Sequence, residues 1–512
     1  MNDAFYFFSW QDVNFLKSEL LLVVVWLIAF CGLLLPKKIT SFFVPFVCVS
    51  VLLINIGLLI FSLNDIESIN ELSKTTFFWN DLFYQNKFIV YLKLLISVSG
   101  LFAIWIQYSA HKIHKKTIPE WFVILLGGVL SAQFLLISAN LFGVYVSLEM
   151  LSICGYLLVA FYDKQLIDKT NKGKLIASSF NYLVFGAVSS ACLLYGFSWW
   201  YGLSGSFSIP VIFGVFGSEL NFNTNQTTFL IAFLLIGIGF LFKLAAVPLH
   251  FWISEVYKNS SAGTIFFLAT IPKIAVSGIL FFVLNYSIHL SSNLQEIIFS
   301  ILSILGVLSA LFGGFLAIQQ TNFKRFFAYS GVSQMGFLIL LLVYNFQNTI
   351  ISTNGIIIFW IFYMLSNAII WKFCAELEGT INTELSIKNL KNLPFSSKII
   401  LSMASLSLAG FPPLGGFLVK MIVIFVAFQN YQSHSNSVFL FSLIGIGLAT
   451  LIGFFYYLKI PYFLFIKSSE GRQTAAQEKD FEINVISNLS LFFSVVLILI
   501  NVVLALYAIR FL

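Results

Sequence analysis

Long apolar runs separated by short polar connections fill almost the whole chain of 512 residues. Most of them reach about 20 residues, the length of helix that crosses the apolar core of a bilayer. They are continuous and do not alternate with polar positions, which excludes a membrane β-barrel. The pattern predicts an all-α polytopic membrane protein with about 14 transmembrane helices. The predicted spans are 19–35, 41–62, 88–107, 120–138, 139–162, 175–202, 227–249, 260–285, 294–318, 323–344, 353–376, 396–428, 437–465 and 485–507.

The basic residues test this helix count, because membrane proteins carry an excess of Lys and Arg on the cytoplasmic side. If the connection that holds Lys37 and Lys38 lies inside, 18 of the 28 basic residues fall in inside connections, 4 in outside segments and 6 within spans. This asymmetry supports the count and places both termini outside. It also explains the net charge of +7 without a nucleic-acid partner. No basic stretch precedes the first run, so we expect a spanning helix there and not a cleaved signal.

The composition agrees with this class. Hydrophobic residues make up 59% of the chain, charged residues only 10%, and the mean hydropathy is +0.95. The five cysteines lack the spacing of a metal, haem, iron–sulfur or disulfide site. No glycine-rich nucleotide motif follows a predicted strand. We therefore expect no cofactor in this chain, and any electron-transfer cofactor would lie in other chains.

Proline interrupts two of the apolar runs, at residues 244–248 (LAAVP) and 408–416 (LAGFPPLGG). Proline removes a backbone donor and kinks or ends a helix. Inside a membrane, such backbone survives only where protein or a water-filled cavity satisfies it. Both segments read Leu-Ala-x-x-Pro and fall in the seventh and twelfth spans, which run in opposite directions. This is typical of two inverted five-helix repeats, with helices 7 and 12 broken at functional sites.

The predicted organisation follows from these repeats. Residues 1–119 would hold peripheral helices 1–3, and residues 120–285 the first repeat, helices 4–8. Residues 286–466 would hold the second, inverted repeat, helices 9–13. Residues 467–512 would hold helix 14.

Four charged residues lie deep inside apolar runs: Glu149, Lys243, Lys273 and Lys420. A charge near the bilayer centre costs at least roughly 2.5–3.5 kcal/mol on insertion scales, and such residues usually mark ion or proton pathways. Glu149 would be a switchable partner of Lys243, Lys273 a central relay and Lys420 the donor toward the outside. The alternative is that these groups form static ion pairs or that Lys243 snorkels to the interface.

Other polar residues near these spans are open to two interpretations. His250, beside the first break, could relay protons because imidazole titrates near neutral pH, or it could cap carbonyls that the break leaves free. Lys93, Lys372 and Lys459 lie nearer the ends of their spans. We expect these three amines to reach the membrane interface by snorkelling.

Five segments now carry a resemblance to a known family: residues 148–152, 181–187, 243–252, 324–330 and 408–420. In this order they resemble subunit N, also called subunit 2, of the proton-pumping NADH–quinone oxidoreductases, respiratory complex I. The resemblance covers nearly the whole chain. It implies an antiporter-like subunit of the membrane arm with 14 helices, two inverted repeats and broken helices 7 and 12. Such a subunit translocates protons and binds no redox centre.

The resemblance also implies roles for single residues. Glu149 matches the family's acid of the fifth helix, while Lys243, Lys273 and Lys420 match the lysines of the seventh, eighth and twelfth helices. NADH, FMN, iron–sulfur clusters and quinone would be bound by partner subunits. The partners would be an adjacent antiporter-like subunit and small membrane subunits. A bacterial plasma membrane is the expected location, with the mitochondrial inner membrane as the alternative.

Two positions depart from the family pattern. Gln334 stands where the family often has histidine, so no protonatable relay is expected there, although glutamine can still order water. Lys258 replaces an acid on the inner side, which weakens the idea that this loop gathers protons through carboxylates. Two other functions stay open: a sodium–proton antiporter or membrane-bound hydrogenase subunit of the same fold, and a structural spacer whose charges only hold helices together.

Overall fold

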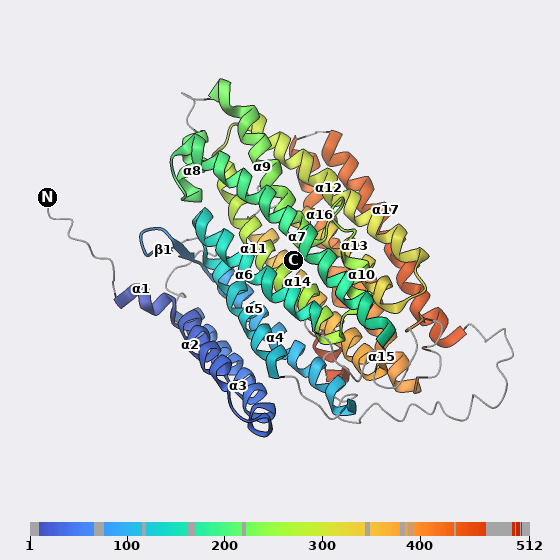
Figure 1. Cartoon of the computed structure of the whole chain (residues 1–512). Coiled ribbons are helices and arrows are strands. Elements are labelled where there is room, and N and C mark those ends of the chain that lie inside the picture. Colours follow the sequence, from blue (N-terminus) through green and yellow to red (C-terminus); the bar gives the residue numbers. More distant parts are fainter. Residues whose placement is uncertain are drawn as a thin grey trace.

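The structure, a computed structural model, describes residues 10–65, 76–114, 119–161, 169–217, 222–343, 349–378, 385–387, 390, 393–434, 437–466, 494–496, 498–501 and 503. These residues form one bundle of helices that run side by side, with one small hairpin at an end of the bundle (Figure 1). The elements are α1 (Trp10–Phe15), α2 (Lys17–Gly32), α3 (Lys37–Asp65), β1 (Thr76–Phe78), β2 (Phe83–Gln85), α4 (Lys87–His114), α5 (Pro119–Ile137), α6 (Leu141–Ala160), α7 (Lys169–Ser204), α8 (Ile209–Gly217), α9 (Phe222–Leu244), α10 (Ile253–Asn259), α11 (Ala262–Tyr286), η3 (Ser287–His289), α12 (Ser292–Gln319), α13 (Phe323–Val343), α14 (Thr349–Glu378), α15 (Phe395–Ala409), α16 (Gly415–His434), α17 (Ser437–Pro461) and η6 (Tyr462–Ile466).

The all-α membrane fold is confirmed. Eleven helices of the described part are long and apolar enough to cross a membrane. Three predicted spans are absent from that set for different reasons. The first, α2, has 16 residues, the twelfth is divided into α15 and α16, and most of the fourteenth lies outside the described residues. The count of 14 therefore stays a prediction.

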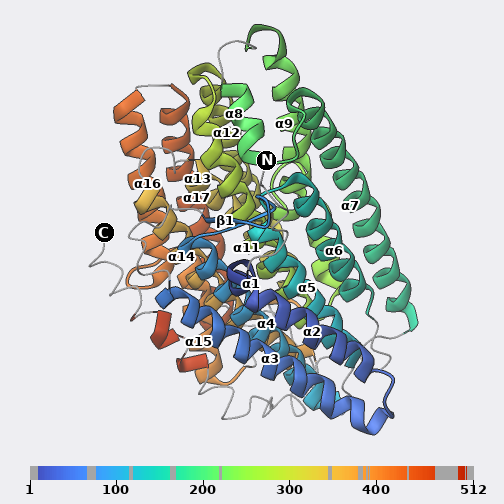
Figure 2. The ribbon, with the colours of Figure 1, turned by 90° about the vertical axis from the view of Figure 1, so that its left-hand side faces the viewer.

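Helices α11, α13 and α14 form the centre of the bundle. They lie between α7 at one edge and α16 and α17 at the other (Figure 2). Within their spanning windows, 94% of α11 and of α13 is buried, against 28% of α17. The outer helices expose large apolar side chains such as Phe42, Phe180 and Phe455, as expected of surfaces that face lipid.

Helices α12 and α13 pack backbone against backbone. A Cβ added at Gly313 of α12 would overlap the backbone of Ser333, and one at Gly336 of α13 would overlap that of Ala310. Small residues allow this close approach between membrane helices. The contact fixes the position of α13, which lies next to the centre of the candidate site.

Two isolated backbone bridges occupy matching places in the chain. Asn140, just before α6, pairs with Ser208, and Asn322, just before α13, pairs with Ser386. Each asparagine also caps its helix: Asn140 Oδ1 accepts from the backbone N–H of residue 142 at 2.9 Å, and Asn322 Oδ1 from that of residue 325 at 3.2 Å. In the predicted order, these bridges join the start of helix 5 or 10 to the segment after helix 6 or 11.

The sequence pattern gave no sign of the hairpin. Strand β1 pairs antiparallel with β2, and Phe83 of β2 also bridges to Ser138 after α5. Each strand has three residues, too few for a recognisable alternation of polar and apolar positions. The hairpin ties the connection before α4 to the end of α5.

Candidate functional site

The first break ends α9 directly after Lys243 and Leu244. Ala245 takes the left-handed conformation with φ +57°, and its N–H donates to the Phe242 carbonyl at 3.0 Å. The next N–H, of Ala246, reaches back to the Leu241 carbonyl at 3.0 Å. This double hydrogen bond is the Schellman motif, which closes the carboxyl end of a helix. The Trp252 indole N–H adds a second donor to the Phe242 carbonyl at 3.3 Å.

The second break repeats this geometry. Gly410 has φ +83°, its N–H donates to the Ser407 carbonyl at 3.0 Å, and the Phe411 N–H donates to the Leu406 carbonyl at 3.1 Å. Both predicted helix breaks are therefore present. The left-handed residues align Ala245 with Gly410, so the Leu-Ala-x-x-Pro match is displaced by one residue. The structural equivalence of the two breaks therefore depends on the left-handed residue that ends each helix, and not on the shared Leu-Ala pair.

Lys243 is 8% exposed and lies in the last turn of α9. Its Nζ has no hydrogen-bond partner among the described residues. Instead it lies over three rings, 5.3 Å from the centroid of Tyr156, 6.0 Å from Tyr182 and 5.6 Å from Phe242. Aromatic faces and the negative carboxyl end of a helix both attract a cation. These groups replace water around the ammonium without fixing it to an acid.

Glu149 is half-buried on α6 and forms no ion pair with Lys243 in the described part of the chain. Phe142, Val146 and Ile153, spaced by one or two turns on the same helix face, are exposed. The expected Glu149–Lys243 contact is therefore not made in this arrangement, and Glu149 lies beside an open surface of α6.

Lys273 lies at the centre of the bundle. It is fully buried on α11 and follows Pro272, which leaves one carbonyl of the preceding turn without its usual donor. Its Nζ has no hydrogen-bond partner among the described residues. A Cβ built on Gly331 of α13 would lie 3.9 Å from this nitrogen. Lys273 therefore faces the backbone of α13.

Lys420 lies after the second break, and its side chain reaches back to the helix before it. It belongs to α16, and its Nζ donates to the carbonyl of Ala409, the last residue of α15. The ammonium also lies 5.4 Å from the ring centroid of Phe337. The free carbonyls at the end of α15 are the negative end of its dipole, so they stabilise a cation here. As at Lys243, a lysine lies at the carboxyl end of a half-helix.

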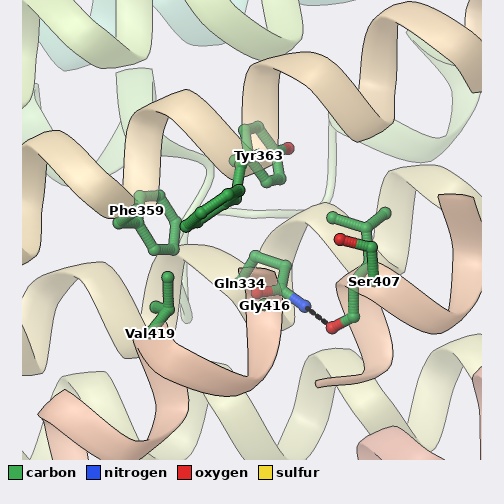
Figure 3. A pocket seen from close by; sticks show the side chains of 8 residues that line it. Gln334, Phe359, Tyr363, Ser407, Gly416 and Val419 are labelled. Atoms are coloured by element: carbon green, nitrogen blue, oxygen red, sulfur yellow. Dashed lines mark hydrogen bonds between the residues drawn. The ribbon is translucent and has the colours of Figure 1, made fainter. Parts of the chain in front are cut away.

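Gln334 binds the carbonyl next to the one that Lys420 uses. Its Nε2 donates to the Leu408 carbonyl at 3.0 Å and lies 3.3 Å from the Tyr457 hydroxyl. A small cavity adjoins it, with about 20 Å³ open to the centre of a water molecule. Figure 3 shows Tyr363 on one side of this cavity, and Gln334 and Ser407 on the other. A site of this volume, with the polar side chains of Gln334, Tyr363 and Ser407 in a mainly apolar lining, is large enough for one water molecule.

The C-terminal segment completes the second break. Asn501 is buried, and its Oδ1 accepts from the N–H of Gly415, the first residue of α16, at 3.0 Å. The Ser407 hydroxyl reaches the same oxygen at 3.4 Å. Sequence reasoning missed Asn501, because a single asparagine in an apolar run carries no partner information.

His250 is half-buried in the first break. Its Nδ1 has no hydrogen-bond partner among the described residues, and its ring centroid lies 6.4 Å from that of Tyr329. The carbonyls at the end of α9 are bound by Ala245, Ala246 and Trp252 instead. A relay role for His250 stays a prediction.

Two of the three snorkelling predictions were wrong. Lys93 is fully buried and pairs with Glu19 of α2 at 2.6 Å. Lys372 is 4% exposed, pairs with Glu376 at 2.7 Å, and lies 5.0 Å from the Trp105 ring centroid. The third, Lys459, donates to two carbonyls at the end of α12, at 2.9 and 2.5 Å. Lys93 and Lys372 pair with acids on a neighbouring helix and on the next turn. The position of a lysine within its span does not predict such a partner.

Ion pairs join α13 to its neighbours at the end where α13 begins. Arg325 pairs with Glu255 of α10, and Lys324 pairs with Glu378 of α14 at 2.5 Å. Lys324 also donates to the Ser260 carbonyl at 2.7 Å. Glu255, an acid near Lys258 in this region, is thus tied to an arginine.

The fold and the site define a class of protein: a polytopic helical membrane protein with two discontinuous helices, each with a buried lysine at a half-helix carboxyl end. Discontinuous helices of this kind form the ion sites of membrane transporters. The sequence profile described as "NADH:quinone oxidoreductase/Mrp antiporter, TM" matches residues 138–448. The chain belongs to this family.

Individual relatives agree with this assignment. NADH-quinone oxidoreductase subunit N of Pelagibacter ubique is 31% identical over 471 residues, which cover 91% of this chain and 92% of the relative. A chain of respiratory complex I from Thermus thermophilus has the same fold, with a TM-score of 0.71, 21% identity, and 96% and 97% of the two chains covered. A chain of the Mrp complex from Dietzia is similar in fold as well, with a TM-score of 0.75, 15% identity, and 96% and 95% covered.

Proposed function

We propose that this chain is the proton-translocating membrane subunit of an NADH–quinone oxidoreductase, of the subunit N type. Electron transfer from NADH to quinone would take place in partner subunits, which would hold the flavin and the iron–sulfur clusters. One observation carries the proposal: three buried lysines lie near two broken helices, and two of them lie at half-helix carboxyl ends. An amine in such a place can bind and release a proton without large movements of the backbone.

The proposed path begins at Lys243 and ends at Lys420, with Lys273 between them. When Glu149 approaches Lys243, the carboxylate favours the charged amine. When it withdraws, burial and aromatic surroundings favour release of the proton. The proton would pass to Lys273 and then to Lys420, which would deliver it to the outside. His250 would be a further relay at the first break.

We also propose the inverted-repeat organisation, with residues 120–285 and 286–466 as the repeats and residues 1–119 and 467–512 as flanking parts. The matching Schellman motifs at Ala245 and Gly410 support it. The matching Asn–Ser bridges before α6 and α13 support it independently, because the two features occur in the same order in both halves.

The partners would be other membrane-arm subunits. Glu149 lies half-buried on a helix face whose apolar neighbours are exposed, and a charge at such a face requires cover within a bilayer. An adjacent antiporter-like subunit with a polar group at this depth would supply it. A bacterial plasma membrane is the proposed location, with the mitochondrial inner membrane as the alternative.

A sodium–proton antiporter or membrane-bound hydrogenase subunit is the second candidate. The likeness in fold does not separate the two candidates, because the match to the Mrp complex and the match to complex I have similar TM-scores. The relative at 31% identity across nine-tenths of the chain favours the oxidoreductase.

The first prediction tests the proposed function directly. Lys243→Ala and Lys420→Ala should each lower the number of protons translocated per NADH oxidised, because each removes a proton-binding group from the path. The measurement is proton uptake and NADH oxidation in inverted membrane vesicles that carry the complete complex. Lys459→Ala, which changes a lysine near the end of α17 that donates to carbonyls at the end of α12, is the matched control. Unchanged yields in both test variants would contradict the proposal.

A further inference from the structure

Between Lys273 and the second break, the described side chains leave a narrow space. It lies beside Gly331 of α13, where a Cβ would be 3.4 Å from the Tyr363 hydroxyl and 3.9 Å from Lys273 Nζ. Among the described residues, no other heavy atom comes within 4 Å of that position, apart from the glycine, its two chain neighbours and its own helix backbone. The two polar groups are therefore separated by no more than the sum of these distances, a gap that about one or two water molecules can bridge.

Tyr363 also lines the small cavity at the second break (Figure 3). Gln334 and Ser407 line the same cavity, and Gln334 binds the Leu408 carbonyl. Lys420 binds the very next carbonyl, of Ala409. Tyr363 thus adjoins both the space in front of Lys273 and the cavity next to the Lys420 site.

The Tyr363 ring is held firmly in this place. It is 5% exposed, stacks on Phe359 with ring centroids 5.6 Å apart, and meets Trp360 edge-on at 5.8 Å. Such packing leaves rotation of the hydroxyl hydrogen as the easiest movement of the side chain. A hydroxyl can accept one proton while it donates another, whereas the amide of Gln334 can only orient its neighbours.

We propose that Tyr363 is a proton-relay residue between Lys273 and Lys420, and that Gly331 keeps open the space through which it exchanges protons with Lys273. This inference rests on the proposed function. A proton leaves the Lys273 ammonium and reaches the Tyr363 oxygen through water. Tyr363 releases its own hydroxyl proton to water in the cavity beside Gln334, from which it passes to Lys420. Tyr363 is a neutral hydroxyl with one proton before and after the step, and no bond between heavy atoms changes.

The test uses the complete complex in inverted membrane vesicles, with the rates of proton uptake and of NADH oxidation measured together. Tyr363→Phe removes only the hydroxyl and should slow proton uptake roughly tenfold or more, the scale of a lost proton-transfer group. Gly331→Ala fills the space and should have a similar effect, since its Cβ would be in ordinary contact with both polar groups and would not clash. Gly331→Ser brings a hydroxyl into the same space and should retain most of the uptake.

The controls are Tyr84→Phe and Gly447→Ala. Tyr84 is a buried tyrosine of the hairpin, and a Cβ at Gly447 would meet nothing within 4 Å. Both should leave proton uptake unchanged. Full uptake in Tyr363→Phe, or equal loss in Gly331→Ala and Gly331→Ser, would overturn the inference. The serine and alanine variants decide the question alone if Tyr363→Phe does not assemble.

Lys243→Ala and Lys420→Ala, measured in the same vesicles, separate the two levels of the argument. If these lysine variants lose proton uptake while Tyr363→Phe and Gly331→Ala keep it, the relay inference is wrong and the proposed function stands. If all four variants keep full uptake, the proposed function itself is wrong.

Discussion

At the residue scale, Gly410 combines two requirements. Its left-handed backbone, φ +83°, ends α15, and its missing Cβ leaves room for the Lys420 side chain, whose Cδ would lie 2.7 Å from such an atom. At the first break Ala245 adopts the same conformation with a Cβ present. Left-handed backbone costs a residue with a Cβ roughly 1–2 kcal/mol. The second break therefore requires glycine for the lysine as well as for the turn.

Gly410→Ala should thus impair stability and transport together. We expect a loss of roughly 1–2 kcal/mol in stability from the backbone alone, and lower proton translocation because the added methyl displaces Lys420. Thermal unfolding of the purified complex and proton uptake in vesicles measure the two effects. Gly447→Ala, at an open helical position, is the control. Wild-type behaviour in both assays would show that the Lys420 side chain does not need this space.

At the scale of elements, each broken helix creates free backbone groups in a place without bulk water, and named groups satisfy them. Trp252 serves the end of α9, Gln334 and Lys420 serve the end of α15, and Asn501 serves the start of α16. An unpaired backbone group in the membrane costs several kcal/mol. The partners of a break are therefore part of its architecture, even when they come from distant segments.

Asn501 offers a test at this scale. Both hydrogen bonds at this side chain end on Oδ1. Asn501→Ala should destabilise the second break by roughly 1–2 kcal/mol, the usual value of a lost helix cap, and should lower the amount of assembled complex. Asn501→Asp keeps an acceptor oxygen at a helix N-terminus and should behave nearly as wild type. Equal defects in the two variants would show that the cap is not what Asn501 contributes.

At the scale of the whole molecule, the sequence was sufficient for the class, the helix breaks and the depth of Lys243, Lys273 and Lys420. Hydropathy and proline position determine these features directly. It could not predict which groups meet across helices. Glu149 was predicted to be a switchable partner of Lys243, but the sequence gave no hint of the aromatic rings that lie beside that amine. Contacts of this kind depend on helix rotation, which a uniformly apolar helix does not encode: every face of such a helix looks alike.

The N-terminal helices show the same limit and lead to the last prediction. Glu19 and Lys93 are both fully buried and form an ion pair between α2 and α4. Ser97 of α4 donates to Asn55 of α3 at 2.9 Å, and Gln133 of α5 donates to Ser97 at 2.9 Å, so one polar cluster joins four helices. The cavity beside Gln334 and the apolar cavity beside Phe240 are lined by other residues. We interpret the polar cluster as a lock, a structural contact that holds α2 and α3 against the rest of the bundle, and not as a second proton path.

Removal of one partner should therefore be worse than removal of both. Glu19→Gln or Lys93→Met leaves a buried charge unpaired and should cost roughly 3–5 kcal/mol, whereas the double variant Glu19→Leu/Lys93→Met should regain most of that stability. Thermal unfolding of the purified complex measures this difference, and proton uptake per NADH measures transport. We expect the double variant to pump at the wild-type yield. A stable double variant that no longer pumps would show that the pair carries protons, and the lock interpretation would be wrong.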